Sequence, residues 1–303
     1  YCIIHFCSNN IPKYIKQDLK KIGVNIILLP TMSPSNECKY IFNKIKNFDL
    51  IIIDGYNFHY NYQNFFYKKN KKIIIIDDLI YRKFSSHIII NHAPLVSKLK
   101  YKNLNKSKLG LGLKYKIVQK CFYSNKILDR SKLQNNIFIC LGSGDSNMTV
   151  KIKLINFLLK LEDIKKIFLV SSQKRSLINR FKGVSGFNRL IIYENIASKD
   201  IFKLMQKSRF GICSSSTVAI ESFTASLPLL VGYSANNQLN IYKGLTKSKV
   251  ALGIGSFQSL KIDKLKSMIK ILEDNNYLNK HFYSHKEAHN LSSRKKLLDK
   301  ILL

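Results

Sequence analysis

The chain has 303 residues, and its 51 Lys and Arg against 18 Asp and Glu give a formal net charge of +33. Hydrophobic residues make up 46% of the sequence and charged residues 23%, which excludes a disordered polycation or a membrane protein by bulk composition. A chain of this length holds one large or two ordinary domains.

Short apolar runs rich in Ile and Val alternate with longer amphipathic stretches along the chain. This alternation predicts βα units around mainly parallel sheets, an α/β fold. The expected strands are 2–6, 24–29, 50–53, 72–76 and 87–90, followed by a second series at 136–141, 166–170, 190–193, 210–213 and 229–232. The expected helices are 12–22, 36–46, 149–161, 199–207, 217–226 and 260–273. The polar stretch 123–135 between the two series predicts two Rossmann-like domains, at 1–125 and 136–303, facing across a cleft.

The positive charge comes mostly from Lys, in a chain also rich in Ile, Asn and Tyr. One explanation is a polyanionic partner such as nucleic acid. The other is a solvated Lys surface produced by an A+T-rich genome. We favour the second and expect no nucleic-acid partner, because Lys residues are spread through every segment without a single basic arm.

The six cysteines are scattered, and no two form a C-x-x-C pair. Most lie in apolar, strand-like runs, so we expect reduced core residues in a cytoplasmic protein. No apolar run approaches the roughly 18 residues that a membrane-spanning helix needs, so no membrane span is expected.

The most informative segment follows the expected strand at 210–213. Ser214, Ser215 and Ser216 precede a helix that begins near Thr217, which places hydroxyls and free backbone N–H groups at the positive end of a helix dipole. This arrangement suits a diphosphate. Glu221 lies one helical turn after Thr217, on the same face, and could accept hydrogen bonds from ribose hydroxyls. An ordinary N-cap of a core helix is the alternative explanation.

Two further features lie at the ends of expected strands. The loop from Gly142 to Asn147 is rich in glycine and contains Asp145, which is typical of close backbone approach to a phosphate but is a weak signal alone. Asp54, and the pair Asp77 and Asp78, end two successive strands of the first series, so their side chains are expected in the first domain's part of the cleft.

Seven short motifs in this order resemble a known family. They are IIDGY at 52–56, IDD at 76–78, LGLKY at 111–115, LGSGD at 141–145, ENIA at 194–197, SSSTVAIE at 214–221 and NQ at 237–238. The family is that of the UDP-sugar hydrolases of pseudaminic acid biosynthesis, which remove UDP from UDP-2,4-diacetamido-2,4,6-trideoxy-β-L-altropyranose. The resemblance implies the GT-B fold and a kinship with the peptidoglycan N-acetylglucosaminyltransferase. It also implies a metal-independent attack of water on the anomeric carbon, with no cofactor.

The resemblance further implies roles for individual residues. The residues implied to hold the diphosphate are Gly142, Asp145, Asn147, Ser215, Ser216 and Thr217. Ile196 is implied to lie against uracil, and Glu221 is implied to bind the ribose. Asn237 and Gln238 are implied to lie near the sugar or phosphate. Tyr56 would lie close to the hydrolytic water, and Asp54 is the second catalytic candidate. Preorganised donors around the diphosphate would carry much of the rate.

One departure from the family is serious. The family places its general base, a His, in a Gly-rich G-x-G-H-x-x-R loop after the first strand, and no such loop occurs here, where residues 1–8 resemble the second strand instead. In a sheet of order 3-2-1-4-5 the first strand is central, so its absence should leave two buried edges unpaired. We therefore expect either a missing N-terminal segment, with the base His upstream of Tyr1, or an inactive homologue.

The other histidines are weaker candidates for the base. His59 and His92 lie near strand ends but outside the family's loop, and His5 is expected to be partly buried within a strand. The histidines at 281, 285 and 289 fit a solvated or packing face of a helix better than a metal site.

These observations lead to three functional hypotheses. The first is a hydrolase that releases UDP from a UDP-linked diacetamido-trideoxy sugar. The second is a GT-B glycosyltransferase that uses a UDP-amino sugar and shares the same UDP contacts, and the third is an inactive nucleotide-sugar-binding homologue. The expected partner is the UDP-amino-sugar substrate, and the expected state is a monomer.

Overall fold

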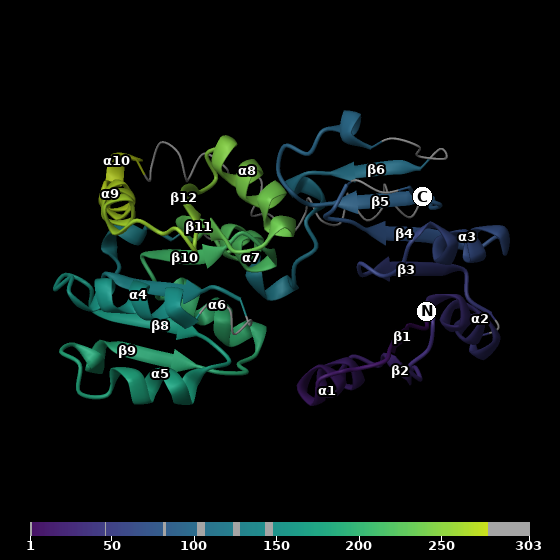
Figure 1. Cartoon of the computed structure of the whole chain (residues 1–303), viewed down its shortest axis with the longest axis horizontal. Coiled ribbons are helices and arrows are strands. Elements are labelled where there is room, and N and C mark those ends of the chain that lie inside the picture. The colour runs from purple at the N-terminus through teal and green to yellow at the C-terminus, as the bar shows by residue number, and fades with distance from the viewer. Residues whose placement is uncertain are drawn as a thin grey trace. The chain divides into compact units, whose positions relative to one another are not determined.

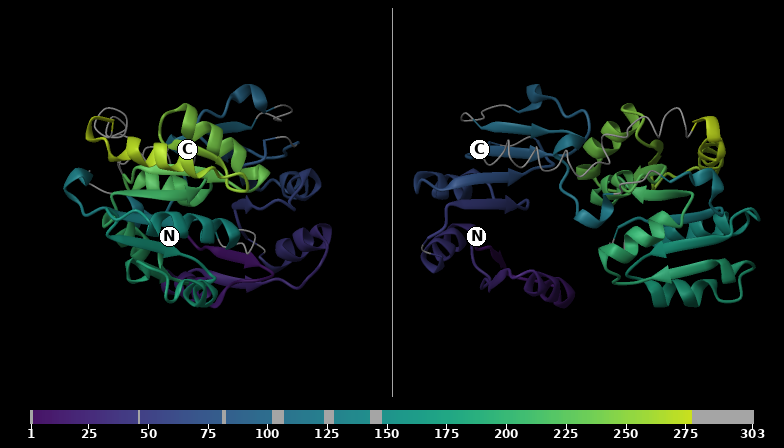
Figure 2. Two further views of the ribbon diagram at one scale, coloured as in Figure 1. Left: turned by 60° about the vertical axis from the view of Figure 1, so that its left-hand side comes forward. Right: turned by 180° about the vertical axis from the view of Figure 1, so that it is seen from behind.

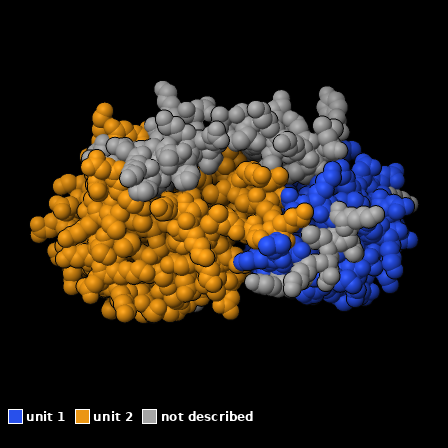
Figure 3. All heavy atoms as spheres, turned by 90° about the horizontal axis from the view of Figure 1, so that it is seen from above, with its two compact units in different colours: residues 1–90, 99–109 blue, residues 91–98, 110–303 orange. Residues whose placement is uncertain are grey.

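A computed structural model describes residues 2–45, 47–80, 83–101, 107–123, 128–142 and 148–277. The chain forms two compact units, coloured separately in Figure 3. Unit 1 comprises Tyr1–Ile90 and Leu99–Leu109, and unit 2 comprises Asn91–Lys98 and Gly110–Leu303. The expected domain bounds, 1–125 and 136–303, stay a prediction.

Unit 2 contains one continuous six-stranded sheet of order β12-β11-β10-β7-β8-β9, in which all neighbouring strands are parallel. Its strands are β7 (Asn136–Cys140), β8 (Lys166–Val170), β9 (Leu190–Tyr193), β10 (Phe210–Ser214), β11 (Leu229–Tyr233) and β12 (Leu252–Ser256). The first strand in the sequence, β7, is central. The chain moves outward from β7 on one side through β8 and β9, and on the other through β10, β11 and β12 (Figure 1).

Helices of unit 2 pack on both faces of this sheet. They are α4 (Met148–Leu159), α5 (Lys174–Phe181), α6 (Ser198–Gln206), α7 (Thr217–Thr224), α8 (Leu239–Lys247), α9 (Ile262–Glu273) and the short α10 (Asn275–Tyr277). Side chains alternate along β7, so that Ile137 and Ile139 enter the core under α4, α5 and α9, whereas Phe138 enters the core under α6, α7 and α8. A central parallel strand is thus buried on both faces.

Unit 1 contains two separate sheets (Figure 2). One pairs β1 (His5–Ser8) with β2 (Asn25–Leu28), and the other has the order β3-β4-β5-β6, with β3 (Leu50–Asp54), β4 (Lys72–Ile76), β5 (Ile88–Asn91) and β6 (Lys108–Leu111). The helices are α1 (Lys13–Lys21), α2 (Pro34–Lys44) and α3 (Tyr60–Lys68). The pairs β1·β2, β3·β4 and β4·β5 are parallel.

Short 3₁₀ helices occupy several connections. They are η1 (Lys98–Lys100), η2 (Leu113–Tyr115), η3 (Lys120–Phe122), η4 (Arg130–Lys132), η6 (Phe187–Arg189) and η7 (Asn236–Gln238). Of the polar stretch expected as a linker, the structure describes Tyr123 and residues 128–135, and this part packs on unit 2. Arg130 is fully buried, and its guanidinium donates to the carbonyls of Met205, Ser208, Ala225 and Ser226.

All ten expected strands are present, with ends shifted by a few residues. The sequence did not predict β6 and β12, which are short and carry Gly110, or Gly253 and Gly255, within the apolar run. It also did not predict α3, α5 and α8, because α3 is rich in aromatic residues of low helix propensity and the other two have few apolar positions. Within the described residues, no helix has both the length and the hydropathy needed to cross a bilayer.

Candidate functional site

The three serines lie where the sequence predicts them, between a buried strand and a helix. Ser214 ends β10, and Ser216 precedes the first residue of α7, Thr217, which is exposed. The Ser216 side chain makes no capping hydrogen bond to the helix, and its hydroxyl instead lies 3.0 Å from the Ser214 hydroxyl. The start of α7 therefore keeps N–H groups that have no intrahelical acceptor.

Ser215 is the most unusual of the three. Its backbone N–H donates to the Gly232 carbonyl on β11 at 2.8 Å, which holds the turn against the sheet. Its hydroxyl is buried and has no hydrogen-bond partner among the described residues. A buried hydroxyl of this kind normally has a partner, so Ser215 is suited to donate to a ligand atom.

Gly142 approaches this serine turn from the neighbouring strand. Cys140 at the end of β7 pairs with Cys213 of β10, so the loop after β7 and the serine turn start at the same edge of the sheet. Gly142 has φ +90°, and a Cβ at this position would lie 3.9 Å from Ser214 Oγ. The loop begins in a left-handed conformation that favours glycine. Asp145 and Asn147, also expected in this loop, lie outside the described residues.

Glu221 lies on α7, one turn after Thr217, as the spacing predicts. Burial raises the pKa of its carboxyl group to about 7. The carboxylate has no hydrogen-bond or ion-pair partner within the described part of the chain. Burial, followed by the charge of Glu221, raises the pKa of the nearby Cys121 thiol. A largely buried carboxylate without a donor is destabilised, and ligand hydroxyl groups would supply the missing donors.

The remaining expected binding residues follow other strands of the same sheet. Ile196 lies in the connection between β9 and α6, half-buried against the apolar cluster that α6 and α7 contribute to. Asn237 and Gln238 lie in η7 after β11, and Gln238 Oε1 accepts from the Ser234 N–H at 2.8 Å. All three positions follow the carboxyl ends of strands, where open α/β sheets bind their ligands.

Lys151 is a buried cation near this edge of the sheet that sequence reasoning missed. It lies in the first turn of α4, is fully buried, and donates from Nζ to Ser171 Oγ at 3.1 Å and to Gln173 Oε1 at 2.7 Å. Both acceptors follow β8, the strand beside β7. A buried ammonium group at this edge could balance the charge of a bound diphosphate. In the sequence, Lys151 stands out only as a Lys within an apolar helix. Because this chain contains many Lys residues, that feature did not single it out.

A separate polar cluster lies in unit 1, at the ends of β3 and β4. The Tyr56 hydroxyl donates to Asp78 Oδ2 at 2.6 Å. Burial and the negative charge of Asp78 raise the pKa of Asp54. Asp54 and Tyr56 thus each interact with Asp78, which follows the neighbouring strand.

Asp77 has a different environment from its neighbour Asp78. It is buried and accepts hydrogen bonds from the Tyr101 hydroxyl at 2.9 Å and from the Ile80 N–H at 3.0 Å. These bonds hold the turn after β4, where Ile80 has φ +72°. Asp77 is therefore a structural residue that stabilises the strand end.

The histidines also differ in their positions. His59 occupies the N-cap position of α3 without a side-chain capping bond. His5, expected to be partly buried, is exposed, because β1 pairs only with β2 within the described residues. The three histidines at 281, 285 and 289 lie outside the described residues.

Comparison with known proteins gives a result at the level of the fold. No protein-family model matches the sequence, and no curated protein sequence matches it significantly. Among solved structures, MurG of Acinetobacter baumannii superimposes with a TM-score of 0.64 at 12% identity, covering 99% of this chain and 91% of that one. The chain has the GT-B fold.

Other structures with this fold are similar over nearly the whole chain. Phytolacca americana UGT2, solved with UDP-2-fluoro-glucose and pterostilbene, gives a TM-score of 0.63 at 12% identity and covers 99% of this chain and 92% of its own. A putative UDP-N-acetylglucosamine 2-epimerase from Listeria monocytogenes gives 0.56 at 14% identity, with coverages of 94% and 87%. The fold class expected from the sequence, α/β with two Rossmann-like parts of GT-B type, is confirmed.

Proposed function

We propose that unit 2 binds a UDP-sugar and that the chain is a GT-B glycosyltransferase acting on a UDP-linked amino sugar. The observation that carries the proposal is the half-buried carboxylate of Glu221, which has no hydrogen-bond or ion-pair partner among the described residues and lies one helical turn from the serine turn. A nucleoside diphosphate offers what this edge of the sheet lacks, namely ribose hydroxyls as donors and phosphate oxygens as acceptors.

Similar structures support the choice of ligand. UGT2 was solved with UDP-2-fluoro-glucose, the rhamnosyltransferase SpnG was solved with thymidine diphosphate, and the Listeria protein is a putative UDP-N-acetylglucosamine 2-epimerase. Each of these proteins shares the fold with this chain at 14% identity or less. Together they favour a nucleoside-diphosphate sugar over other anions.

Each described group of the site then has a role. Ser215, Ser216 and the first N–H groups of α7 would donate to the diphosphate, together with backbone N–H groups near Gly142. Negative charge grows on the diphosphate as the bond to the sugar breaks, so donors fixed in advance at this position stabilise the transition state. Glu221 would accept from the ribose, Ile196 would lie against uracil, and Asn237 and Gln238 would contact the sugar or phosphate.

A hydrolase is the second candidate, in which water replaces the acceptor. The interaction of Tyr56 and Asp54 with Asp78 in unit 1 favours it, because a carboxylate with a raised pKa is a stronger base toward an attacking water. The resemblance of the seven motifs to UDP-sugar hydrolases points the same way. A nucleotide-sugar-binding protein without turnover is the third candidate.

Isotope labelling separates the three candidates. The protein is incubated in H₂¹⁸O with UDP-N-acetylglucosamine or the UDP-linked diacetamido-trideoxy sugar, with and without a small-molecule and lipid extract of the source cells. UDP release only in the presence of the extract supports the glycosyltransferase. Release in buffer alone, with ¹⁸O in the free sugar, identifies the hydrolase and overturns the first proposal, and binding without release identifies the third candidate.

Calorimetry with UDP tests the binding site. Glu221→Ala should weaken binding by about 1.5–3 kcal/mol, because it removes a charge-assisted hydrogen bond to the ribose. Glu162→Ala, at an exposed position of unit 2, is the matched control and should leave the affinity unchanged. Equal affinity of both variants would remove Glu221 from the site.

A further inference from the structure

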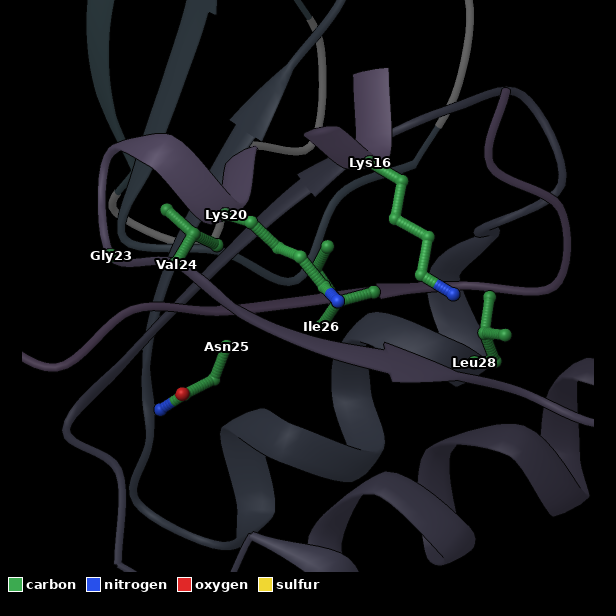
Figure 4. Close-up of a pocket in the computed structure, with 7 residues that line it drawn as sticks. All are labelled: Lys16, Lys20, Gly23, Val24, Asn25, Ile26 and Leu28. Atoms are coloured by element: carbon green, nitrogen blue, oxygen red, sulfur yellow. The ribbon is translucent and has the colours of Figure 1, made fainter. Parts of the chain in front are cut away.

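A pocket of about 590 Å³ in unit 1 lies between α1 and β2, with the Lys16 and Lys20 side chains above Ile26 and Leu28 (Figure 4). Lys20 and Asn25 in its lining are exposed, and none of its polar side chains has a hydrogen-bond partner in the part of the chain that the structure describes. A ligand would meet no donor or acceptor held in a fixed position there.

Fixed polar side chains occur instead in unit 2, in the turns that follow β11 and β12. Two glutamines hold the backbone of Ser234 from both sides. The Ser234 N–H donates to Gln238 Oε1 at 2.8 Å, and the Ser234 carbonyl accepts from Gln258 Nε2 at 3.0 Å. Gln258 Oε1 in turn accepts from the Ser256 hydroxyl at 2.5 Å. Gln238 is proposed above to contact the ligand, whereas Ser256 and Gln258 belong to the next strand outward.

The end of β12 has a shape that brings these groups together. An extra residue in β12 shifts its register against β11, so that Ser256 pairs with Tyr233. Gly255, beside the shift, has φ +89°, a left-handed conformation that favours glycine. The Phe257 N–H donates to the Tyr233 carbonyl at 2.9 Å, which ties the turn after β12 to the turn after β11. Bulges of this kind re-aim the side chains that follow them.

The hydrogen bonds of Ser234 fix which end of the Gln238 side chain is offered to a ligand. A backbone N–H can only donate, so the atom that faces it must be the acceptor Oε1. Nε2 lies on the other side of the amide group, and among the residues that the structure describes it has no hydrogen-bond partner. Gln238 is half-buried. It therefore presents N–H donors, and the ligand atom that it meets must be an acceptor.

We propose that Gln258 and Ser256 are positioning residues, which hold Gln238 with its Nε2 donors turned to an acceptor oxygen of the bound UDP-sugar. The role rests on the proposed function, since it needs a UDP-sugar in unit 2. Without Gln258 the Ser234 carbonyl loses this donor, and the turn is free to rotate until Gln238 offers its oxygen instead. A side chain fixed by a second layer of hydrogen bonds loses less freedom on binding, so the brace increases affinity.

Calorimetry with UDP-N-acetylglucosamine and with UDP tests the role. Gln258→Met keeps the length of the side chain and adds no charge, and it should weaken binding of the sugar nucleotide at least roughly three-fold. A loss with UDP-N-acetylglucosamine alone places the acceptor oxygen on the sugar, and an equal loss with UDP places it on the phosphate. Ser259→Ala, at the exposed neighbouring position, is the control and should change neither affinity. If Gln258→Met also leaves both affinities unchanged, the proposal is wrong.

A double-mutant cycle separates positioning from a general loosening of the turn. Gln238→Met should weaken binding about ten-fold, because it removes the donor itself. If Gln258 acts through Gln238, adding Gln258→Met to this variant changes the affinity by less than about two-fold. Losses that multiply would show that Gln258 acts by another route and would contradict the assigned role.

Hydrogen exchange of the ligand-free protein makes failure of this role distinguishable from failure of the proposed function. The Ser234 amide should exchange at least roughly three-fold faster in Gln258→Met than in the parent, because the turn opens more easily. Amides of Phe210–Ser214 are the control and should not change. Equal exchange of the Ser234 amide removes the brace whatever the protein binds. A parent protein that binds neither nucleotide overturns the proposed function and this role together, whereas binding that Gln258→Met does not weaken overturns this role alone.

Discussion

Strand β10 of unit 2 and strand β3 of unit 1 are both five-residue apolar strands of parallel sheets, yet they differ in burial. Every residue of β10 is buried, whereas β3 has one buried residue among five. Ile212 of β10 pairs with Ile139 on one side and Leu230 on the other, whereas Ile52 of β3 has Ile74 as its one strand partner in the described part of the chain. Similar apolar sequences thus give a core strand or an exposed edge, depending on whether the strand has neighbours on both sides among the described residues.

The comparison of β8 with β1 gives the same result. The three middle residues of β8 are buried, whereas no residue of β1 is buried. A parallel sheet obtains its two covered faces from the helices of neighbouring βα units, so a strand with few neighbouring units is more exposed than a strand between two of them. Burial in such a sheet is therefore a property of neighbouring units as much as of the strand itself.

The largest expected effect concerns the interior of unit 2. Arg130→Ala should lower the free energy of unfolding by about 4 kcal/mol, because it removes a fully buried guanidinium that donates to four carbonyls, two of which, those of Ser208 and Ser226, have no other donor among the described residues. Urea unfolding followed by circular dichroism, with hydrogen exchange of β7 and β10 amides, measures the loss. Lys132→Ala, two residues away and exposed, should change it by less than about 0.5 kcal/mol.

The second prediction tests the strand comparison directly. Ile212→Ala should lower the free energy of unfolding by about 3 kcal/mol, because it leaves a cavity beside a fully buried strand. Ile52→Ala, at the third residue of β3 in unit 1, should lower the free energy of unfolding by less than about 1 kcal/mol, since this side chain is largely solvated. Equal losses in urea unfolding would show that Ile52 is covered in solution.

The third prediction concerns pH. The carboxyl group of Glu221 has a pKa of about 7 in the folded chain against an ordinary value of 4.5, so the folded state binds the proton more tightly. Stability from this group is complete below pH 4.5 and falls as the pH rises to about 7. Glu221→Gln should therefore stabilise the protein by about 2 kcal/mol at pH 8 and have little effect at pH 4. Thermal unfolding at both pH values is the measurement, and a stabilisation that is the same at both would contradict the assigned pKa.

The smallest effect on stability is expected at the polar cluster of unit 1. Tyr56→Phe removes the hydrogen bond to Asp78 at a site open to solvent, so the free energy of unfolding should change by less than about 0.5 kcal/mol. If unit 1 takes part in a hydrolytic reaction, the same variant should slow UDP release at least roughly ten-fold. A stability loss as large as that of Ile212→Ala would instead make Tyr56 part of the core of unit 1.

The sequence was sufficient to predict the ten strands that are continuous apolar runs. β12 escaped prediction because Gly253 and Gly255 interrupt its apolar pattern, and Gly232 pairs with Gly255 beside a shift in register. The glycines have a packing role, since a Cβ on Gly253 would lie 2.5 Å from the Tyr242 hydroxyl. Such contacts come from distant parts of the chain and leave no local signature.

The candidate site was partly predictable for a physical reason. Residues that follow parallel strands meet at one edge of the sheet, so the serine turn, Gly142 and η7 could be grouped from their positions alone. The burial and the hydrogen-bond partners of individual side chains could not be predicted from the sequence in the same way. The roles of Lys151 as a buried donor and of Asp77 as the acceptor for a turn depend on side chains brought close only by folding.

The burial of Arg130 also bears on how the composition of this chain can vary. Lys and Arg are interchangeable at a solvated surface, where a point charge on a flexible stem is sufficient. Four carbonyls around one side chain require several donors in a plane, which guanidinium provides and ammonium does not. A drift toward Lys can therefore proceed almost freely over the surface, but it must stop at this position.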